Sequence, residues 1–166
     1  MINARRVPWD MPAYLERVRA ACFICELLRG NPTYVEHVVH RDDVGIVFLA
    51  RYPILWGHLL VAPIEHREHV FTDFTTDEHV ALQRLVHRAG RALTAVVDTE
   101  RAYVLSLGSQ QGNRHVHWHV VPLPEGIPYE EQQIAVFAEE KGHLDVDDAD
   151  MAELARQVRD AMDEEA

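Results

Sequence analysis

Cysteine is scarce in this chain of 166 residues, and long apolar runs are missing. Its two cysteines lie only three positions apart, at Cys22 and Cys25, which does not indicate a framework of disulfides. No segment approaches the roughly 20 apolar residues that a membrane span requires. Residues 1–12 contain charges and two prolines where a secretion signal would have an apolar core. We therefore expect a cytoplasmic protein without a membrane partner.

Lysine and arginine are also few in this sequence. The 16 Lys and Arg residues face 27 Asp and Glu residues, which gives a net charge of −11. Such a surface repels a phosphate backbone, so we expect no nucleic-acid partner. A small phosphorylated ligand remains compatible, because backbone N–H groups can bind an anion locally in an acidic protein. The length and the 48% hydrophobic content predict one globular domain over 1–166.

Periodicity and turn residues predict an α+β fold. The long helix expected over 76–97 opens with a capping box formed by Thr75 and Glu78. A helical segment on either side of the cysteine pair is expected over 13–29, and a terminal helix over 148–162. Short strands are expected over 35–40, 44–50, 57–63, 102–107 and 115–121, and they indicate an antiparallel sheet. Residues 125–147 are expected to be ordered but with little regular structure.

Three histidines alternate with apolar residues in HVHWHVV, residues 115–121. In a strand this alternation sends His115, His117 and His119 to one accessible face, while the apolar side chains pack on the core. Three imidazoles together could bind one catalytic metal ion. Alternatively, one imidazole could attack phosphorus while its neighbours hold phosphate oxygens. The residues alone leave both chemistries open.

HVHWHVV resembles the signature of the histidine-triad (HIT) superfamily, in which histidine alternates with apolar residues. The segment FLARYPILWGHLLVAPIEH, residues 48–66, and the capped helix that follows are similar to the order of elements in that family. The resemblance covers roughly residues 20–124 and leaves 125–166 as a C-terminal extension. It implies a HIT-like fold, with a five-stranded antiparallel sheet, one long helix and terminal helices.

The resemblance also implies an activity. A HIT-family nucleotide hydrolase or nucleotidyltransferase would cleave a phosphoanhydride or phosphoramidate bond at the α-phosphorus through a covalent nucleotidyl-histidine on His117. His119 would contact the phosphate. Two alternatives stay open: a phosphorylase or transferase with phosphate or a sugar phosphate as acceptor, and a nucleotide-binding protein with little turnover. Relatives are often homodimers, so a homodimer is expected.

Several residues are candidates for binding the substrate by resemblance. The loop before the motif would supply donors from Gln111, Gly112 and Asn113. Phe23 and Ile24 fall where some relatives build the wall of the base pocket, although both are equally suited to a core. Arg51 and Arg114 are the cations nearest to the motif and could offset phosphate charge.

Two positions depart from the family pattern. Gly112 stands where many members have Ser or Thr, near the leaving atom of the substrate. Ala50 stands where many members have an acidic or amide residue that holds the ribose. These departures favour the alternative of binding with little turnover.

The cysteine pair suggests a metal. Two thiolates on a tight turn are half of a tetrahedral zinc site, and the missing ligands are usually histidines. A redox dithiol is the weaker interpretation, because no thioredoxin-like context surrounds the pair. The resemblance implies that His66 and His115 complete a structural Zn²⁺ site, one per chain, with His69 as the competitor of His66. His115 would then serve the metal and leave His117 for chemistry. We expect His58 to be packed and hydrogen-bonded.

Overall fold

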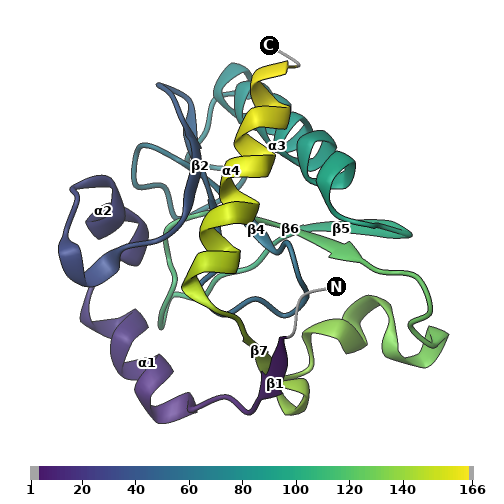
Figure 1. The fold of residues 1–166 in the computed structure, drawn as a ribbon. Helices are drawn as coiled ribbons and strands as arrows, with labels where there is room; N and C mark the ends of the chain where they lie inside the picture. The colour runs from purple at the N-terminus through teal and green to yellow at the C-terminus, as the bar shows by residue number, and fades with distance from the viewer. Residues whose placement is uncertain (1–3, 165–166) are drawn as a thin grey trace.

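A five-stranded antiparallel sheet forms the centre of the molecule (Figure 1). The computed structural model describes residues 4–164, so the limits of the expected domain, 1 and 166, lie outside it. The strands follow the order β2-β3-β4-β6-β5 across the sheet. Their bounds are β2 (Val38–Arg41), β3 (Gly45–Leu49), β4 (Leu59–Pro63), β5 (Arg101–Ser106) and β6 (Trp118–Leu123). The predicted α+β fold with this kind of sheet is confirmed.

The two central strands β3 and β4 are buried along their whole length. Val47 and Leu49 point to one face of the sheet, and Ile46 and Phe48 point to the other. Consecutive apolar residues in a strand supply both faces, because successive side chains alternate. The sheet is therefore covered on both sides, and each cover is a separate hydrophobic cluster.

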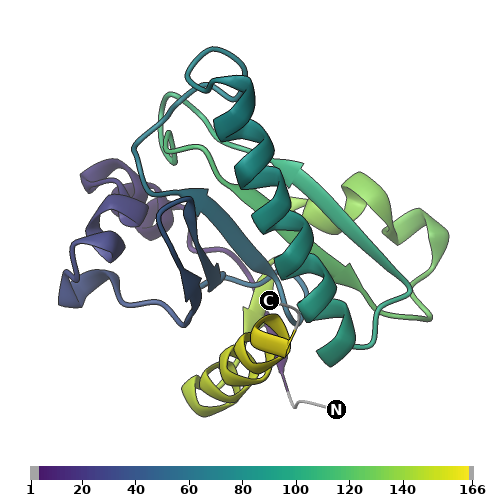
Figure 2. The same ribbon diagram turned by 90° about the horizontal axis from the view of Figure 1, so that it is seen from above.

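Two long helices cover the first face of the sheet, as Figure 2 shows. Helix α3 (Thr76–Val96) opens with the predicted capping box of Thr75 and Glu78. Helix α4 (Asp148–Glu164) packs beside it and buries the residues that its periodicity selects. These buried residues include Met151, Leu154, Val158 and Met162, and the terminal helix expected over 148–162 is present.

Two short helices lie on the opposite face. Helix α1 (Met11–Ala20) is separated from α2 (Phe23–Leu28) by Ala21 and Cys22. The sulfur of Cys22 accepts a hydrogen bond from the backbone N–H of Cys25 at 3.4 Å. Ile24 of α2 is fully buried against Ile46 and Phe48 of the sheet. The cysteine pair therefore stands at the start of a helix that is fixed to the sheet by its apolar side.

The C-terminal extension is more regular than predicted. It contains three short 3-10 turns, η2 (Tyr129–Glu131), η3 (Gln133–Phe137) and η4 (Glu139–Lys141), and strand β7 (His143–Asp145). Strand β7 pairs with β1 (Arg5–Val7), so segments far apart in sequence lie side by side (Figure 1). This pairing is a long-range contact that no local pattern announces. Among the described residues, no helix is both long and apolar enough to cross a bilayer.

Candidate active site and metal centre

The histidine motif is only partly a strand. Strand β6 begins at Trp118, so His115 and His117 lie in the extended segment before it. His115 and His117 are only 1% and 3% exposed, so the accessible face expected for the three histidines is reduced to a cavity that His117 and His119 line. Backbone carbonyls accept the ring N–H groups of His115 and His117, which offsets the cost of burying these polar rings. Val116 and Trp118 pack into the core beneath α3, as predicted.

A backbone hydrogen bond fixes the ring of His117. Its Nδ1 lies 2.7 Å from the carbonyl oxygen of His115. A carbonyl can only accept, so Nδ1 carries the proton and Nε2 keeps its lone pair. Burial lowers the pKa of His117, and the same hydrogen bond opposes that shift. The ring is therefore held neutral, with one unprotonated nitrogen.

His58 orients His119 through a relay of ring nitrogens. The backbone N–H of Ile54 donates to Nδ1 of His58 at 3.4 Å, so the proton of His58 is on Nε2. That nitrogen lies 2.8 Å from Nδ1 of His119 and donates to it. His119 therefore keeps its own proton on Nε2, which has no hydrogen-bond partner in the described part of the chain. The expectation that His58 is packed and hydrogen-bonded is confirmed.

A cavity of about 300 Å³ opens beside His117 and His119. Phe48 of β3 and Leu60 of β4 line it, together with His58, which directly precedes β4. The remaining walls come from segments that lie outside the histidine motif. The N-terminal segment, which includes α1, contributes Trp9, Tyr14, Arg17 and Val18, and η3 contributes Phe137. The cavity therefore combines two polar imidazoles with largely apolar and aromatic walls.

The loop before the motif contributes unequally to this cavity. Asn113 lines it, and its side-chain N–H donates to the hydroxyl oxygen of Tyr14 at 2.7 Å. Its Oδ1 is buried without a hydrogen-bond partner. Gln111 is exposed and lines a neighbouring hollow beside His66. Gly112 packs against α1, where an added Cβ would lie 2.9 Å from Cγ2 of Val18.

The two candidates for the base pocket, Phe23 and Ile24, lie in different surroundings in the structure. Phe23 lines the cavity, and its ring centroid lies 6.0 Å from that of His117. Ile24 is fully buried in the cluster that joins α2 to the sheet, outside the cavity lining. Consecutive helical residues differ by about 100° in direction, so the two cannot face the same space.

Arg51 lines the cavity but is already paired. Its Nε donates to Oε1 of Glu36 at 2.9 Å, and Nη2 of Arg17 lies 3.6 Å from the same oxygen. The side chain of Glu36 is only 6% exposed. Burial raises the pKa of Glu36, and the two guanidinium groups oppose that rise. Neither Glu36 nor Arg17 was predicted from the sequence, because both lie outside the motif and in no recognisable pattern.

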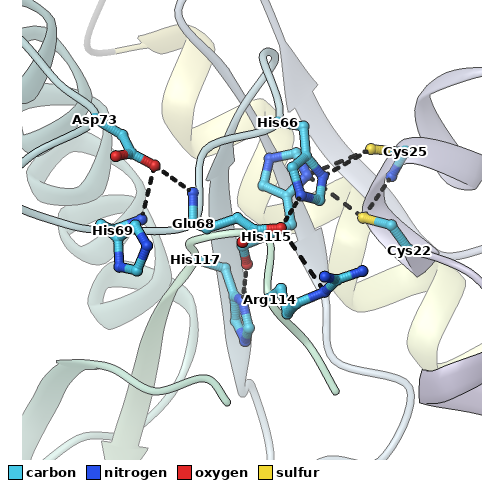
Figure 3. Close-up of polar contacts among 9 residues, drawn as sticks. All are labelled: Cys22, Cys25, His66, Glu68, His69, Asp73, Arg114, His115 and His117. Atoms are coloured by element: carbon cyan, nitrogen blue, oxygen red, sulfur yellow. Dashed lines mark hydrogen bonds and ion pairs between the residues drawn. The ribbon is translucent and has the colours of Figure 1, made fainter. Parts of the chain in front are cut away.

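Cys22, Cys25, His66 and His115 meet at one point (Figure 3). One ligand atom from each residue lies within 4.8 Å of all the others. Nδ1 of His115 is 3.5 Å from the sulfur of Cys22, and Nδ1 of His66 is 3.3 Å from the sulfur of Cys25. Such a group of soft and borderline donors can hold a metal ion.

The other ring nitrogens of both histidines are also held. Nε2 of His115 donates to the carbonyl oxygen of Pro63 at 3.0 Å, and Nε2 of His66 lies 3.1 Å from Oε1 of Glu68. These contacts turn both Nδ1 atoms toward the cysteines. The ring of His69 lies away from the sulfurs, near Asp73 (Figure 3). Arg114 reaches Glu68 at 3.7 Å and does not line the cavity of His117.

Burial keeps Cys25 and His115 of the cluster neutral when no metal ion is bound. Burial, followed by the hydrogen bond to Cys22, raises the pKa of Cys25 to about 11. Burial lowers the pKa of His115 to about 4, so this imidazole is neutral and able to donate a lone pair. The Cys25 thiol is therefore protonated at neutral pH without a metal ion, and an ion bound here would displace that proton, because the thiolate is the ligand.

The model of the HIT domain family matches residues 32–126, more than half of the chain. The chain belongs to the HIT family. The match includes His66, Asn113 and all three histidines of the motif, and it starts after the cysteine pair. The wall residues from α1 and η3 also lie outside it.

Similar proteins support the same assignment. An uncharacterised HIT-like protein of Saccharolobus solfataricus is 28% identical over 104 residues, which cover 61% of this chain and 73% of that protein. A hypothetical histidine triad nucleotide-binding protein of Sulfolobus tokodaii has a TM-score of 0.68 at 19% identity, covering 86% of this chain and 93% of that one. A zinc-bound histidine triad family protein of Mycobacterium smegmatis has a TM-score of 0.67 at 21% identity, with 88% and 96% covered. The last two likenesses concern the fold.

Proposed function

We propose that this HIT-family protein is a nucleotide hydrolase or nucleotidyltransferase in which His117 attacks the α-phosphorus of a nucleotide. The observation that carries the proposal is the hydrogen bond from Nδ1 of His117 to the carbonyl of His115 at 2.7 Å. It leaves the Nε2 lone pair of a neutral imidazole at a cavity large enough for part of a nucleotide.

The reaction runs in two steps. In the first step, Nε2 of His117 forms a bond to the α-phosphorus, and the bond to the leaving oxygen or nitrogen breaks with its electron pair. The leaving group takes a proton from solvent. In the second step, water attacks the same phosphorus, the N–P bond breaks, and a proton passes to solvent. The positive charge on the phosphorylated ring is stabilised by the Nδ1–H bond to the carbonyl of His115.

His119 would donate a hydrogen bond to the phosphate that His117 attacks. The relay through His58 keeps a proton on Nε2 of His119, whose ring centroid lies 4.9 Å from that of His117. A donor at this place would stabilise charge that develops on the phosphate oxygens. Of the three loop residues considered as donors, Asn113 lines the cavity, whereas Gln111 and Gly112 line the neighbouring hollow.

Binding with little turnover is the second candidate, and Gly112 favours it. Val18 fills the space in which a side chain at 112 would stand. Position 112 therefore offers no hydroxyl group near the leaving atom. The leaving group must take its proton from another donor.

For the metal centre we propose one structural zinc ion per chain, held by Cys22, Cys25, His66 and His115. The donor set of two thiolates and two imidazoles is typical of structural zinc. The sulfur-to-nitrogen distances of 3.3 and 3.5 Å agree with an edge of about 3.5 Å in a tetrahedral zinc site. Bound there, zinc would fix α2 to the segment before β6, and His117 does not belong to its ligands.

A substitution of the nucleophile tests the proposal. His117→Ala should lower kcat/KM about 1,000-fold or more on the best member of a panel of dinucleoside polyphosphates and nucleoside phosphoramidates. His87→Ala is the matched control, because it removes an exposed imidazole from α3. Intact-mass spectrometry of the wild type should also detect a nucleotidyl adduct that peptide mapping places on His117.

Near wild-type turnover by His117→Ala would refute covalent catalysis at this residue. If the wild type binds nucleotides but turns over no member of the panel, the second candidate replaces the first.

A further inference from the structure

We propose that Glu36, held by Arg51 and Arg17, accepts hydrogen bonds from the ribose hydroxyl groups of the substrate. This inference rests on the proposed function, because it assigns a residue to the sugar of the bound nucleotide. It makes the protein specific for ribonucleotides over nucleotides that lack the vicinal diol.

Glu36 is the one carboxylate among the described residues that line the cavity of His117. The cavity has ample apolar surface for a base but few acceptors for hydroxyl groups. Ala50 also lines the cavity, and its methyl group cannot accept a hydrogen bond. A diol is a strong donor pair, and a carboxylate with a free oxygen is its best acceptor in proteins.

The place of Glu36 along the cavity fits the sugar. His58 is hydrogen-bonded to His119, the donor proposed for the phosphate. The backbone N–H of Ala50 donates to the carbonyl oxygen of His58 at 2.9 Å. Ala50 is therefore joined to His58, which in turn contacts the residue proposed for the phosphate. Arg51 follows directly and holds Glu36. In a nucleotide the ribose is likewise the group next to the α-phosphate.

The carboxylate is held in position and keeps an oxygen available. Both contacts from Arg51 and Arg17 go to Oε1, and Oε2 has no hydrogen-bond partner within the described chain. Arg51 is itself fixed, because Nη2 donates to the carbonyl oxygen of Val35 at 2.5 Å. Arg17 stacks its guanidinium over the ring of Tyr34 at 4.5 Å, and its buried Nη2 has no hydrogen bond. A ligand hydroxyl could donate to Oε2 and accept from this Nη2.

The test measures equilibrium binding, which does not depend on turnover. Isothermal titration calorimetry on the metal-loaded protein compares AMP, GMP, CMP and UMP with their 2′,3′-dideoxy analogues. The wild type should bind the ribonucleotide about tenfold or more tightly than the dideoxy form of the preferred base. Glu36→Gln should reduce this ratio to below about threefold and leave the affinity for the dideoxy form unchanged.

Two further variants separate binding from folding. Glu153→Gln is the matched control, because it breaks an exposed pair with Arg156 far from the cavity and should preserve the ratio. Glu36→Asp keeps the negative charge beside Arg51, but its side chain is one methylene group shorter. It should therefore also reduce the ratio of ribonucleotide to dideoxynucleotide affinity. It keeps the test open should Glu36→Gln not fold.

Each contrary result has a distinct meaning. If the wild type binds no mononucleotide, the proposed function itself fails. If it binds both forms equally, or if folded Glu36 variants keep the wild-type ratio, Glu36 is only part of an ion pair and the inference is overturned. A change in base preference with an unchanged ratio would assign Glu36 to the base and also overturn it.

Discussion

At the scale of single residues, Glu68 orients the ring of His66, a ligand of the proposed zinc ion. Its carboxylate lies 3.1 Å from Nε2 of His66, which turns Nδ1 toward Cys25. Replacing a carboxylate that orients a metal-bound histidine typically lowers metal affinity about 10- to 100-fold. We expect Glu68→Gln to weaken zinc binding by this factor in a competition titration with a chromogenic chelator.

Glu65→Gln is the control for this prediction, because Glu65 pairs with Arg67 and does not contact His66. Equal zinc affinity in Glu68→Gln and Glu65→Gln would show that the orientation of His66 does not depend on Glu68.

The pair of His58 and His119 makes stability depend on pH. Burial lowers the pKa of His58 to about 3 and that of His119 to about 2, against about 6.5 in the unfolded chain. Below pH 6.5 the unfolded state binds more protons, so stability is present above this pH and is lost as the pH falls toward the folded values. Each histidine should cost about 1.4 kcal/mol between pH 7.5 and pH 5.5.

Urea unfolding at these two pH values measures the effect. His58→Gln should reduce the difference between them by about 1.4 kcal/mol, whereas His87→Gln, which changes an exposed histidine, should not. The same pH dependence in His58→Gln and the wild type would mean that His58 has nearly the same pKa in the folded and unfolded states, which would contradict the prediction.

At the scale of elements, helix α1 closes the cavity by packing on the loop before the motif. Tyr14 holds the side chain of Asn113, and Val18 covers Gly112. A side chain at 112 would place its Cβ 2.9 Å from Val18, so α1 must shift to admit it. We expect Gly112→Ser to lower the free energy of unfolding by about 1–3 kcal/mol.

Val18→Ala supplies the space that Gly112→Ser needs. The double variant should therefore be more stable than the sum of the two single effects predicts, and urea unfolding of all four proteins gives the coupling energy. Strict additivity would show that α1 does not press on this loop.

At the scale of the whole molecule, the proposed zinc site brings together three separate parts of the chain. The cysteines lie at the start of α2, His66 follows β4, and His115 precedes β6. Because binding energy at such a site is folding energy, chelation by EDTA should destabilise the entire domain. A loss of about 3 kcal/mol would lower Tm by about 6–12 °C for a chain of this length.

Cys22→Ser should show the same fall in Tm without chelator and should lower zinc content below one ion per chain. His69→Ala is the matched control, since the ring of His69 lies away from the sulfurs (Figure 3) and its loss should change neither quantity. Full zinc content in a Cys22→Ser, Cys25→Ser double variant would refute the ligand set.

The features that short spacings encode could be predicted from the amino-acid sequence alone. The alternation of HVHWHVV, the turn between Cys22 and Cys25 and the capping box of Thr75 each depend on neighbours within a few residues. The fold class followed from the same kind of pattern, because one long amphipathic helix among short strands leaves few architectures.

Tertiary contacts, in contrast, determine which nitrogen carries each proton and what surrounds His117. The tautomers of His117 and His119 depend on a backbone carbonyl and on His58, which is 61 positions from His119. The ion pair of Glu36 with Arg51 and the packing of Val18 on Gly112 also join distant segments. Such contacts form only when the sheet brings its strands together, because the energy that selects them lies in burial and not in local propensity.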